Sequence, residues 1–151
     1  ARNLGAADGE RDVLAQPPEH LLGQIQVNAV GPLLLTRALL PHLRRSGNPR
    51  ILNVSSQIGS MEISQKMGRD LGYAVSKAAL NMITVKLAMR LRDDGITAVM
   101  LHPGYLKTEM GGAGAAMEPG EAAPSIMSMI DTLTLDDSGT FRRWDGTIHP
   151  W

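Results

Sequence analysis

The sequence contains no cysteine, no excess of either charge and no long apolar run. Without cysteine, disulfide frameworks, thiolate nucleophiles and cysteine-based zinc sites are excluded. Fifteen basic and fifteen acidic residues give a formal net charge of zero, which indicates neither a nucleic-acid partner nor an anionic membrane surface. The apolar runs are far shorter than the roughly 20 residues that span a bilayer, and no signal-peptide pattern is present. We therefore expect a cytoplasmic protein with no nucleic-acid or membrane partner.

The histidines are few and scattered. The four are His20, His42, His102 and His149, and their positions lack the spacing of metal ligands. We therefore interpret each as a surface or packing residue and expect no metal site.

The 151 residues suit one domain. The chain begins at Ala1 without an initiator methionine, and residues 3–12 contain glycine and aspartate in a pattern typical of a loop. We expect residues 1–151 to be a single partial domain.

Apolar residues at helical spacing predict two long helices. The first covers residues 19–45, and the second covers residues 72–94 and ends at Gly95, which suits a helix terminus. The apolar surface of the second helix is broader than one buried stripe, so part of it is expected to face a second subunit.

Pro32 lies inside the first helix, where it has no N–H to offer. The carbonyl of Asn28, four residues earlier, would lose its donor and be left for water or a side chain. Two interpretations remain open. Asn28 either steadies a bend in the helix or holds a water that belongs to a site.

Short apolar runs between these helices predict strands. Residues 50–56 end in Ser55 and Ser56, and residues 96–101 are followed by His102, Pro103 and Gly104. Alternating strands and helices predict a parallel, doubly wound sheet. Ligands bind at the carboxyl ends of such strands, although serines there also commonly satisfy loop backbone.

The remaining segments are less regular. Residues 57–71 read as a loop, and the glycines of residues 105–120 are typical of a mobile lid rather than a phosphate loop, since G-x-G-x-x-G spacing is missing. Residues 121–133 predict a helix that starts near Ala123 because Pro124 restricts it. Residues 140–148 predict a last strand with a tight turn at Asp145-Gly146.

Tyr73 and Lys77 open the second helix one turn apart, on the same face. An unperturbed phenol has a pKa of about 10 and is a poor base, but a neighbouring cation lowers that pKa and makes the group usable for proton transfer. Alone, such a pair is more often a solvated helix face. Here Ser56 and the Pro103-Gly104 turn would converge on the same edge of the sheet, which favours a site.

This combination resembles the short-chain dehydrogenases/reductases, and within them the C-factor-like carbonyl reductases. The resemblance covers most of the chain from about Leu21, and four motifs carry it: Asn28-Ala-Val-Gly-Pro32, Asn53-Val-Ser-Ser56, Tyr73-x-x-x-Lys77 and Pro103-Gly-Tyr-Leu-Lys-Thr108.

The resemblance implies a catalytic set of Asn28, Ser56, Tyr73 and Lys77. Tyr73 would be the acid/base and Ser56 would bind the substrate oxygen, with Ser55 structural. Lys77 would lower the pKa of the phenol and bind the nicotinamide ribose, and Asn28 would hold a water that links Lys77 to solvent.

The resemblance also implies a nicotinamide site. Leu106, through its backbone, and Thr108, through its hydroxyl, would meet the carboxamide, while Pro103 and Gly104 would lie under the ring. The N-terminal strands and the Gly-rich turn that receive the pyrophosphate in this family have no counterpart in the sequence. The fold class expected is therefore the C-terminal part of a doubly wound Rossmann-type α/β sheet.

Two consequences follow from that missing part. The choice between NAD and NADP cannot be read, although the resemblance slightly favours NADP. The 151-residue chain should bind a dinucleotide weakly or not at all, and its first strand should expose an unpaired edge.

The leading hypothesis is an oxidoreductase that transfers hydride between a nicotinamide cofactor and a small carbonyl or alcohol, as a homodimer or homotetramer. The alternative is a non-catalytic dimerisation or C-factor-like signalling module built on the two long helices.

Overall fold

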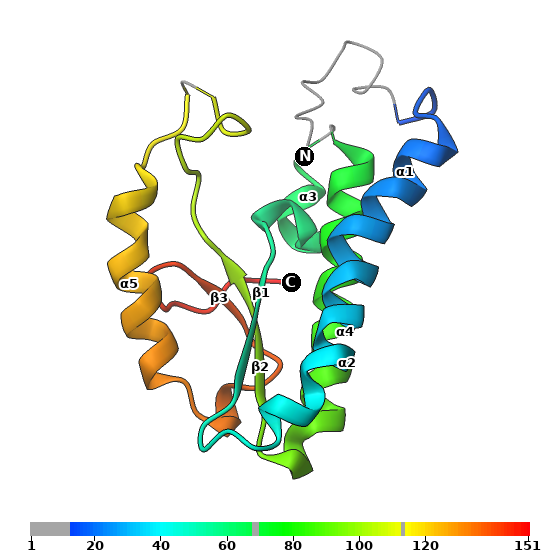
Figure 1. Cartoon of the computed structure of the whole chain (residues 1–151). Coiled ribbons are helices and arrows are strands. Elements are labelled where there is room, and N and C mark those ends of the chain that lie inside the picture. Colours follow the sequence, from blue (N-terminus) through cyan, green and yellow to red (C-terminus); the bar gives the residue numbers. More distant parts are fainter. Residues whose placement is uncertain (1–12, 68–69, 113) are drawn as a thin grey trace.

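The computed structural model describes residues 13–67, 70–112 and 114–151, which form an α/β fold around a parallel sheet. Its strands are β1 (Arg50–Val54), β2 (Thr97–His102) and β3 (Phe141–Arg143), in that order across the sheet. Helices α1, α2 and α4 cover one face and α5 covers the other (Figure 1). The predicted fold class is confirmed. The loop predicted at residues 3–12 lies outside the described residues.

The first predicted helix is present with an irregular centre. It consists of α1 (Pro18–Ile25), a π-helical turn η2 (Gln26–Val30) and α2 (Gly31–Leu43). The N–H of Gly31 bonds to the carbonyl of Gln26, five residues back. The sequence located the irregularity correctly, because Pro32 in the next turn cannot complete a regular α-helical ladder.

The strands pair in parallel over short spans. Residues 50–54 of β1 lie opposite residues 97–101 of β2, and β3 pairs with the last three residues of β2. Every residue of β2 is buried because the strand is central and covered on both faces. Among the described residues β1 pairs only with β2, and none of the described strands lies at its other edge.

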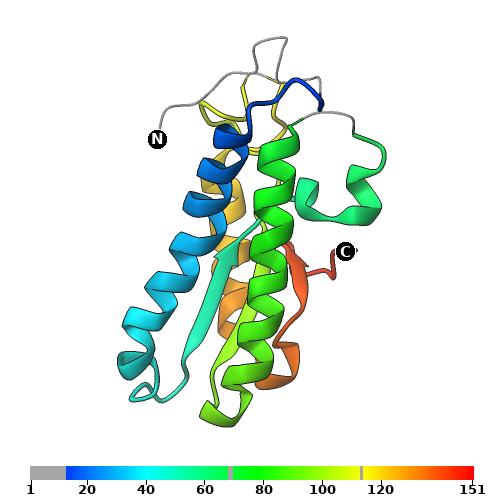
Figure 2. The ribbon, with the colours of Figure 1, turned by 90° about the vertical axis from the view of Figure 1, so that its right-hand side faces the viewer.

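The second long helix, α4 (Leu71–Leu91), is extended by a 3₁₀ turn η4 (Arg92–Asp94) and ends at Gly95 with φ +68°. It runs alongside α1 and α2 (Figure 2). Its buried face carries Ser76, Asn81 and Thr84 besides apolar residues. Each of these polar groups has hydrogen-bond partners. Asn53 Nδ2 of β1 donates to Thr84 Oγ1 at 2.8 Å, whereas Ser76 bonds to Asn28 of η2 and to the carbonyl of Tyr73.

Helix α5 (Pro119–Thr132) begins earlier than predicted. Pro119 occupies a first-turn position. The N–H of Glu118 donates a 2.8 Å hydrogen bond to the side chain of Glu121, and the N–H of Glu121 donates to the carbonyl of Glu118 at 3.0 Å. This reciprocal cap starts the helix before Pro124, which then lies inside it. The predicted start near Ala123 is therefore wrong.

The loop predicted for residues 57–71 contains two short helices, η3 (Gln57–Gly59) and α3 (Met61–Ser64). A further 3₁₀ turn, η5 (Leu135–Asp137), precedes β3. After β3 the chain turns at Gly146 (φ +84°), and an antiparallel bridge joins Arg142 to Ile148. The predicted final strand and turn are confirmed. Among the helices that the structure describes, none is long and apolar enough to cross a membrane.

Candidate active site

Ser56 and Tyr73 meet at the carboxyl end of β1. Ser56 is the second residue after the strand, and Tyr73 lies in the first turn of α4. A hydrogen bond with the Ser56 side chain lowers the pKa of Tyr73, but burial of the phenol has the larger effect, so the pKa is raised above 10.0 overall. Tyr73 is therefore a protonated phenol at neutral pH, next to a serine hydroxyl.

Lys77 lies one turn further along α4. Its ammonium is 5.5 Å from the centre of the Tyr73 ring and donates a 2.9 Å hydrogen bond to the carbonyl of Val54. Burial lowers the pKa of Lys77. The sequence predicted that Lys77 lowers the pKa of the phenol, and this contribution stays a prediction, because burial has the largest effect and raises the pKa overall. The ammonium is directed at the β1 backbone, and desolvation of the phenol dominates.

Asn28 reaches the same end of α4 from the π-helical turn. Its Nδ2 donates to Ser76 Oγ at 3.0 Å, and Ser76 Oγ donates to the carbonyl of Tyr73 at 2.8 Å. Asn28 therefore supports the first turn of α4, which carries the phenol. This contact joins Asn28 to another helix, so both interpretations, a steadied bend and a water held by its carbonyl, stay predictions.

Asn81 is a site-supporting residue that the sequence analysis missed. It is buried, accepts a 2.6 Å hydrogen bond from Ser55 Oγ and donates a 3.2 Å bond to the carbonyl of Gly59. Ser56 is thus flanked by two tethered residues. An asparagine within an apolar helix face was the available signal, since a buried amide needs partners.

Gly59 brings η3 into close contact with α4. A Cβ at this position would lie 2.9 Å from the backbone carbon and from Cβ of Lys77. No side chain fits there without displacing one of the two elements, so the absence of a side chain keeps the segment after Ser56 against Lys77.

The predicted nicotinamide-binding residues lie beyond β2. Gly104 has φ +95°, and a Cβ there would lie 3.1 Å from Trp144 Cδ1. Leu106 forms a β-bridge with Met117, which joins the two ends of the predicted lid, residues 105–120. Thr108 is exposed, and its hydroxyl accepts a 3.2 Å hydrogen bond from the N–H of Gly111. The Thr108 hydroxyl therefore bonds within its own turn, and its contact with a nicotinamide carboxamide stays a prediction.

These residues fit the nicotinamide-ribose end of a dinucleotide. An ammonium has three N–H donors, and among the described residues Val54 is the one hydrogen-bond acceptor of Lys77, so donors remain for ribose hydroxyls. Tyr73 adds a phenol at the same place. The residues that the structure describes include no cluster of three or more potential metal ligands.

Two cavities lie near these elements. A groove of about 540 Å³ runs between α2 and the uncovered edge of β1, and is lined by Leu35, Leu39, Ile51, Val54, Asn28 and Lys77, among others. Its walls therefore include two of the four predicted catalytic residues.

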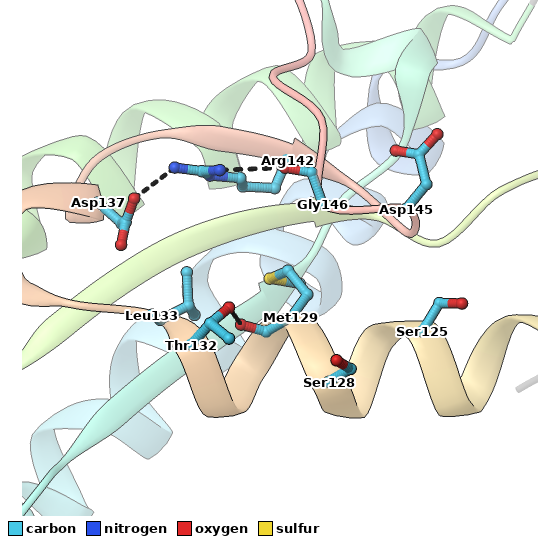
Figure 3. A pocket seen from close by; sticks show the side chains of 9 residues that line it. All are labelled: Ser125, Ser128, Met129, Thr132, Leu133, Asp137, Arg142, Asp145 and Gly146. Carbon is cyan, nitrogen blue, oxygen red and sulfur yellow. Dashed lines mark hydrogen bonds and ion pairs between the residues drawn. The ribbon is translucent and has the colours of Figure 1, made fainter.

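A second cavity of about 410 Å³ lies between α5 and the turn after β3, on the other face of the sheet (Figure 3). Its arginine, Arg142, already bonds Asp137 and the carbonyl of Gly146. Its third charged residue, Asp145, pairs with Arg143, so the charged groups of this cavity have partners and it has no part in the chemistry developed below.

Comparison with known proteins agrees with this geometry. Residues 4–119 match the family model of the short chain dehydrogenases. The chain is 38% identical over 125 residues to C-signal of Myxococcus xanthus, covering 83% of this chain and 75% of that protein. The chain belongs to the short-chain dehydrogenase family.

Solved structures of the family resemble the fold closely. Carbonyl reductase Sniffer of D. melanogaster superposes with a TM-score of 0.88 at 33% identity, and the NADPH-bound carbonyl reductase from chicken fatty liver with 0.87 at 33%. Each match covers 99% of this chain but 64% of the solved chain. The chain thus spans less than two thirds of the length of these two reductases.

Proposed function

We propose that the protein is an oxidoreductase that reduces a small aldehyde or ketone with a nicotinamide cofactor. The observation that carries the proposal is the contact of the Tyr73 phenol with Ser56, with the Lys77 ammonium one helical turn away. NADPH is the favoured cofactor, because a carbonyl reductase of similar structure contains it.

In the proposed reaction, the bound cofactor supplies the hydride. Ser56 donates a hydrogen bond to the carbonyl oxygen of the substrate, and Tyr73 donates its proton to that oxygen as negative charge develops there. A raised pKa suits this direction, because the phenol holds its proton at neutral pH. In the reverse direction the phenol would have to be ionised first, so alcohol oxidation should require a higher pH.

Lys77 has a binding and electrostatic role in this scheme. Its ammonium would bind the ribose hydroxyls and stabilise a phenolate after proton transfer. Asn28 would support the first turn of α4 through its hydrogen bond to Ser76, and its carbonyl would hold a water that links Lys77 to solvent. Pro103, Gly104, Leu106 and Thr108 would hold the nicotinamide end.

The test is turnover of a panel of aldehydes and ketones by the full-length protein with NADPH and with NADH. Tyr73→Phe removes one oxygen atom and should lower kcat by about 10²- to 10⁴-fold, the usual contribution of a general acid. Lys77→Met should raise the KM for the cofactor, with Lys86→Met, an exposed lysine on the same helix, as control. Unchanged turnover in Tyr73→Phe would end the proposal.

A second candidate, a non-catalytic association or signalling module, has specific support. The protein is similar to C-signal, and the α2–β1 groove presents an apolar surface with an uncovered strand edge. The combination of Asn28, Ser56, Tyr73 and Lys77 weighs against it, because a binding module does not need them all. Sedimentation separates the two: a stable, well-folded dimer of the 151-residue chain is expected only for the second.

A further inference from the structure

The last residues of the chain, Thr147–Trp151, fold back across the end of the sheet and are called the strap here. The N–H of Arg143 donates to the carbonyl of Thr147 at 2.8 Å, and the N–H of His149 donates to the carbonyl of Phe141 at 2.7 Å. These bonds attach the strap to β3 in an antiparallel arrangement.

His149 anchors the strap through its side chain. The imidazole is only 3% exposed and lies edge-on to Phe141, with ring centroids 4.6 Å apart. On another side it meets His102 of β2, at 5.1 Å between centroids. Packing of the His149 ring against Phe141 and His102 fixes the direction in which the strap leaves the sheet.

The strap ends on α3, the second of the two short helices between Ser56 and Tyr73. The N–H of Glu62 donates to the main-chain oxygen of Trp151 at 2.8 Å. Glu62 is the second residue of α3, so its N–H is one of the donors that a helix leaves unsatisfied. Ser60 Oγ satisfies the next one, from Ile63. The strap therefore supplies half of the observed N-terminal cap of α3.

A four-residue helix is marginal by itself, so α3 depends on such caps. Directly before it, the N–H of Ile58 donates to Ser56 Oγ and Gly59 packs on Lys77. The segment of residues 57–64 thus connects the strap to two groups of the proposed active site. Its position decides what space remains beside Ser56.

We propose that the strap positions this segment, with His149 and Trp151 as positioning residues for the substrate side of the active site. The proposal rests on the proposed function for its effect on substrate, and on the Glu62–Trp151 hydrogen bond and the packing of His149 against Phe141 for its structural part. The indole of Trp151 is 48% exposed and 6.0 Å from Phe141 between centroids, so it adds an apolar surface beside the segment.

The structural part is tested by amide hydrogen exchange in the full-length protein. Removing residues 149–151 should speed exchange of the Glu62 N–H by about five- to tenfold, the effect of losing one hydrogen bond. The Ser55 N–H, which donates to the carbonyl of Leu101 inside the sheet, is the control and should not change. Removing Trp151 alone is the milder variant, for use if the longer deletion unfolds. Unchanged exchange at Glu62 in a folded variant overturns the proposal.

The functional part is a separation of KM from kcat. The same deletions should raise the KM for the carbonyl substrate about five- to tenfold and change the KM for the cofactor less. Gly59 packs on Lys77, the predicted ribose-binding residue, but the residues predicted to hold the nicotinamide ring lie beyond β2. His149→Leu keeps an apolar side chain in the buried position and should have a near-normal KM, whereas His149→Asp should behave like the deletion. Equal values for Leu and Asp contradict the anchoring role. If no carbonyl is turned over, the proposed function fails, and the hydrogen-exchange result still tests whether the strap positions residues 57–64.

Discussion

Lowering the pH from 7.5 to 5 should destabilise the fold through one buried imidazole, His102. This side chain is 7% exposed at the end of β2, and Nδ1 has no hydrogen-bond partner among the described residues. Burial lowers the pKa of His102 from 6.5 to about 4, with smaller contributions from His149 and Arg143 and an opposing one from Asp145. The folded protein therefore resists protonation at a pH where the unfolded chain accepts it.

This difference in proton uptake makes the folded protein less stable as the pH falls. Because the unfolded state binds the proton first, the neutral imidazole contributes its full stability above pH 6.5, and this is lost as the pH falls toward 4. The loss from His102 alone is roughly 2 kcal/mol at pH 5 and approaches roughly 3 kcal/mol near pH 4. The pKa of His149 is also lowered by burial, so it adds in the same direction.

Urea unfolding at pH 7.5, 6 and 5 measures this loss. His102→Gln, which does not titrate in this range, should lose about 2 kcal/mol less than the wild type between pH 7.5 and 5. His20→Gln, on the exposed surface of α1, is the matched control and should lose as much as the wild type. Asp94, Asp137 and Asp145 have pKa values lowered from 3.8, so the stability that they contribute is lost mainly below pH 3.8, outside this window. Equal losses in the wild type and His102→Gln would refute the reasoning.

Three further outcomes are expected. Asn81→Leu leaves Ser55 Oγ and the carbonyl of Gly59 unpaired, and should lower the free energy of unfolding by roughly 2–4 kcal/mol in urea titrations, more than the exposed Lys86→Leu on the same helix. Carbonyl reduction should stay constant around neutral pH and fall only as the pH passes the raised pKa of Tyr73, whereas alcohol oxidation should rise there; a decline centred near neutrality would count against the assignment. Calorimetry should detect weak or no NADPH binding by the 151-residue chain, and tight binding would contradict its predicted lack of a nucleotide half.

The regular elements around the site could be predicted from the sequence because their signals are local. The apolar spacing and Gly95 define α4, and Pro32 marks the irregular turn that carries Asn28. The meeting of Ser56 and Tyr73 could also be predicted, since parallel strands open onto one edge of the sheet.

What the sequence did not reveal depends on long-range contacts. The helix α3 is capped partly by Trp151, nearly ninety positions away in the chain, so no local pattern announces it. The role of Asn81 depends on which face of α4 is buried. The direction of the Tyr73 pKa depends on burial, whereas the sequence showed only the distance in residues to Lys77.

Proton transfer by Tyr73 is the centre of the proposed mechanism, and a pair of tyrosine variants tests it most directly. In the full-length protein, kcat for the best carbonyl substrate is measured for Tyr73→Phe and for Tyr105→Phe, which removes the hydroxyl that donates to the carbonyl of Gly111. We predict a fall of about 10²- to 10⁴-fold for Tyr73→Phe and less than about threefold for Tyr105→Phe. Equal, small effects in both folded variants would contradict the mechanism.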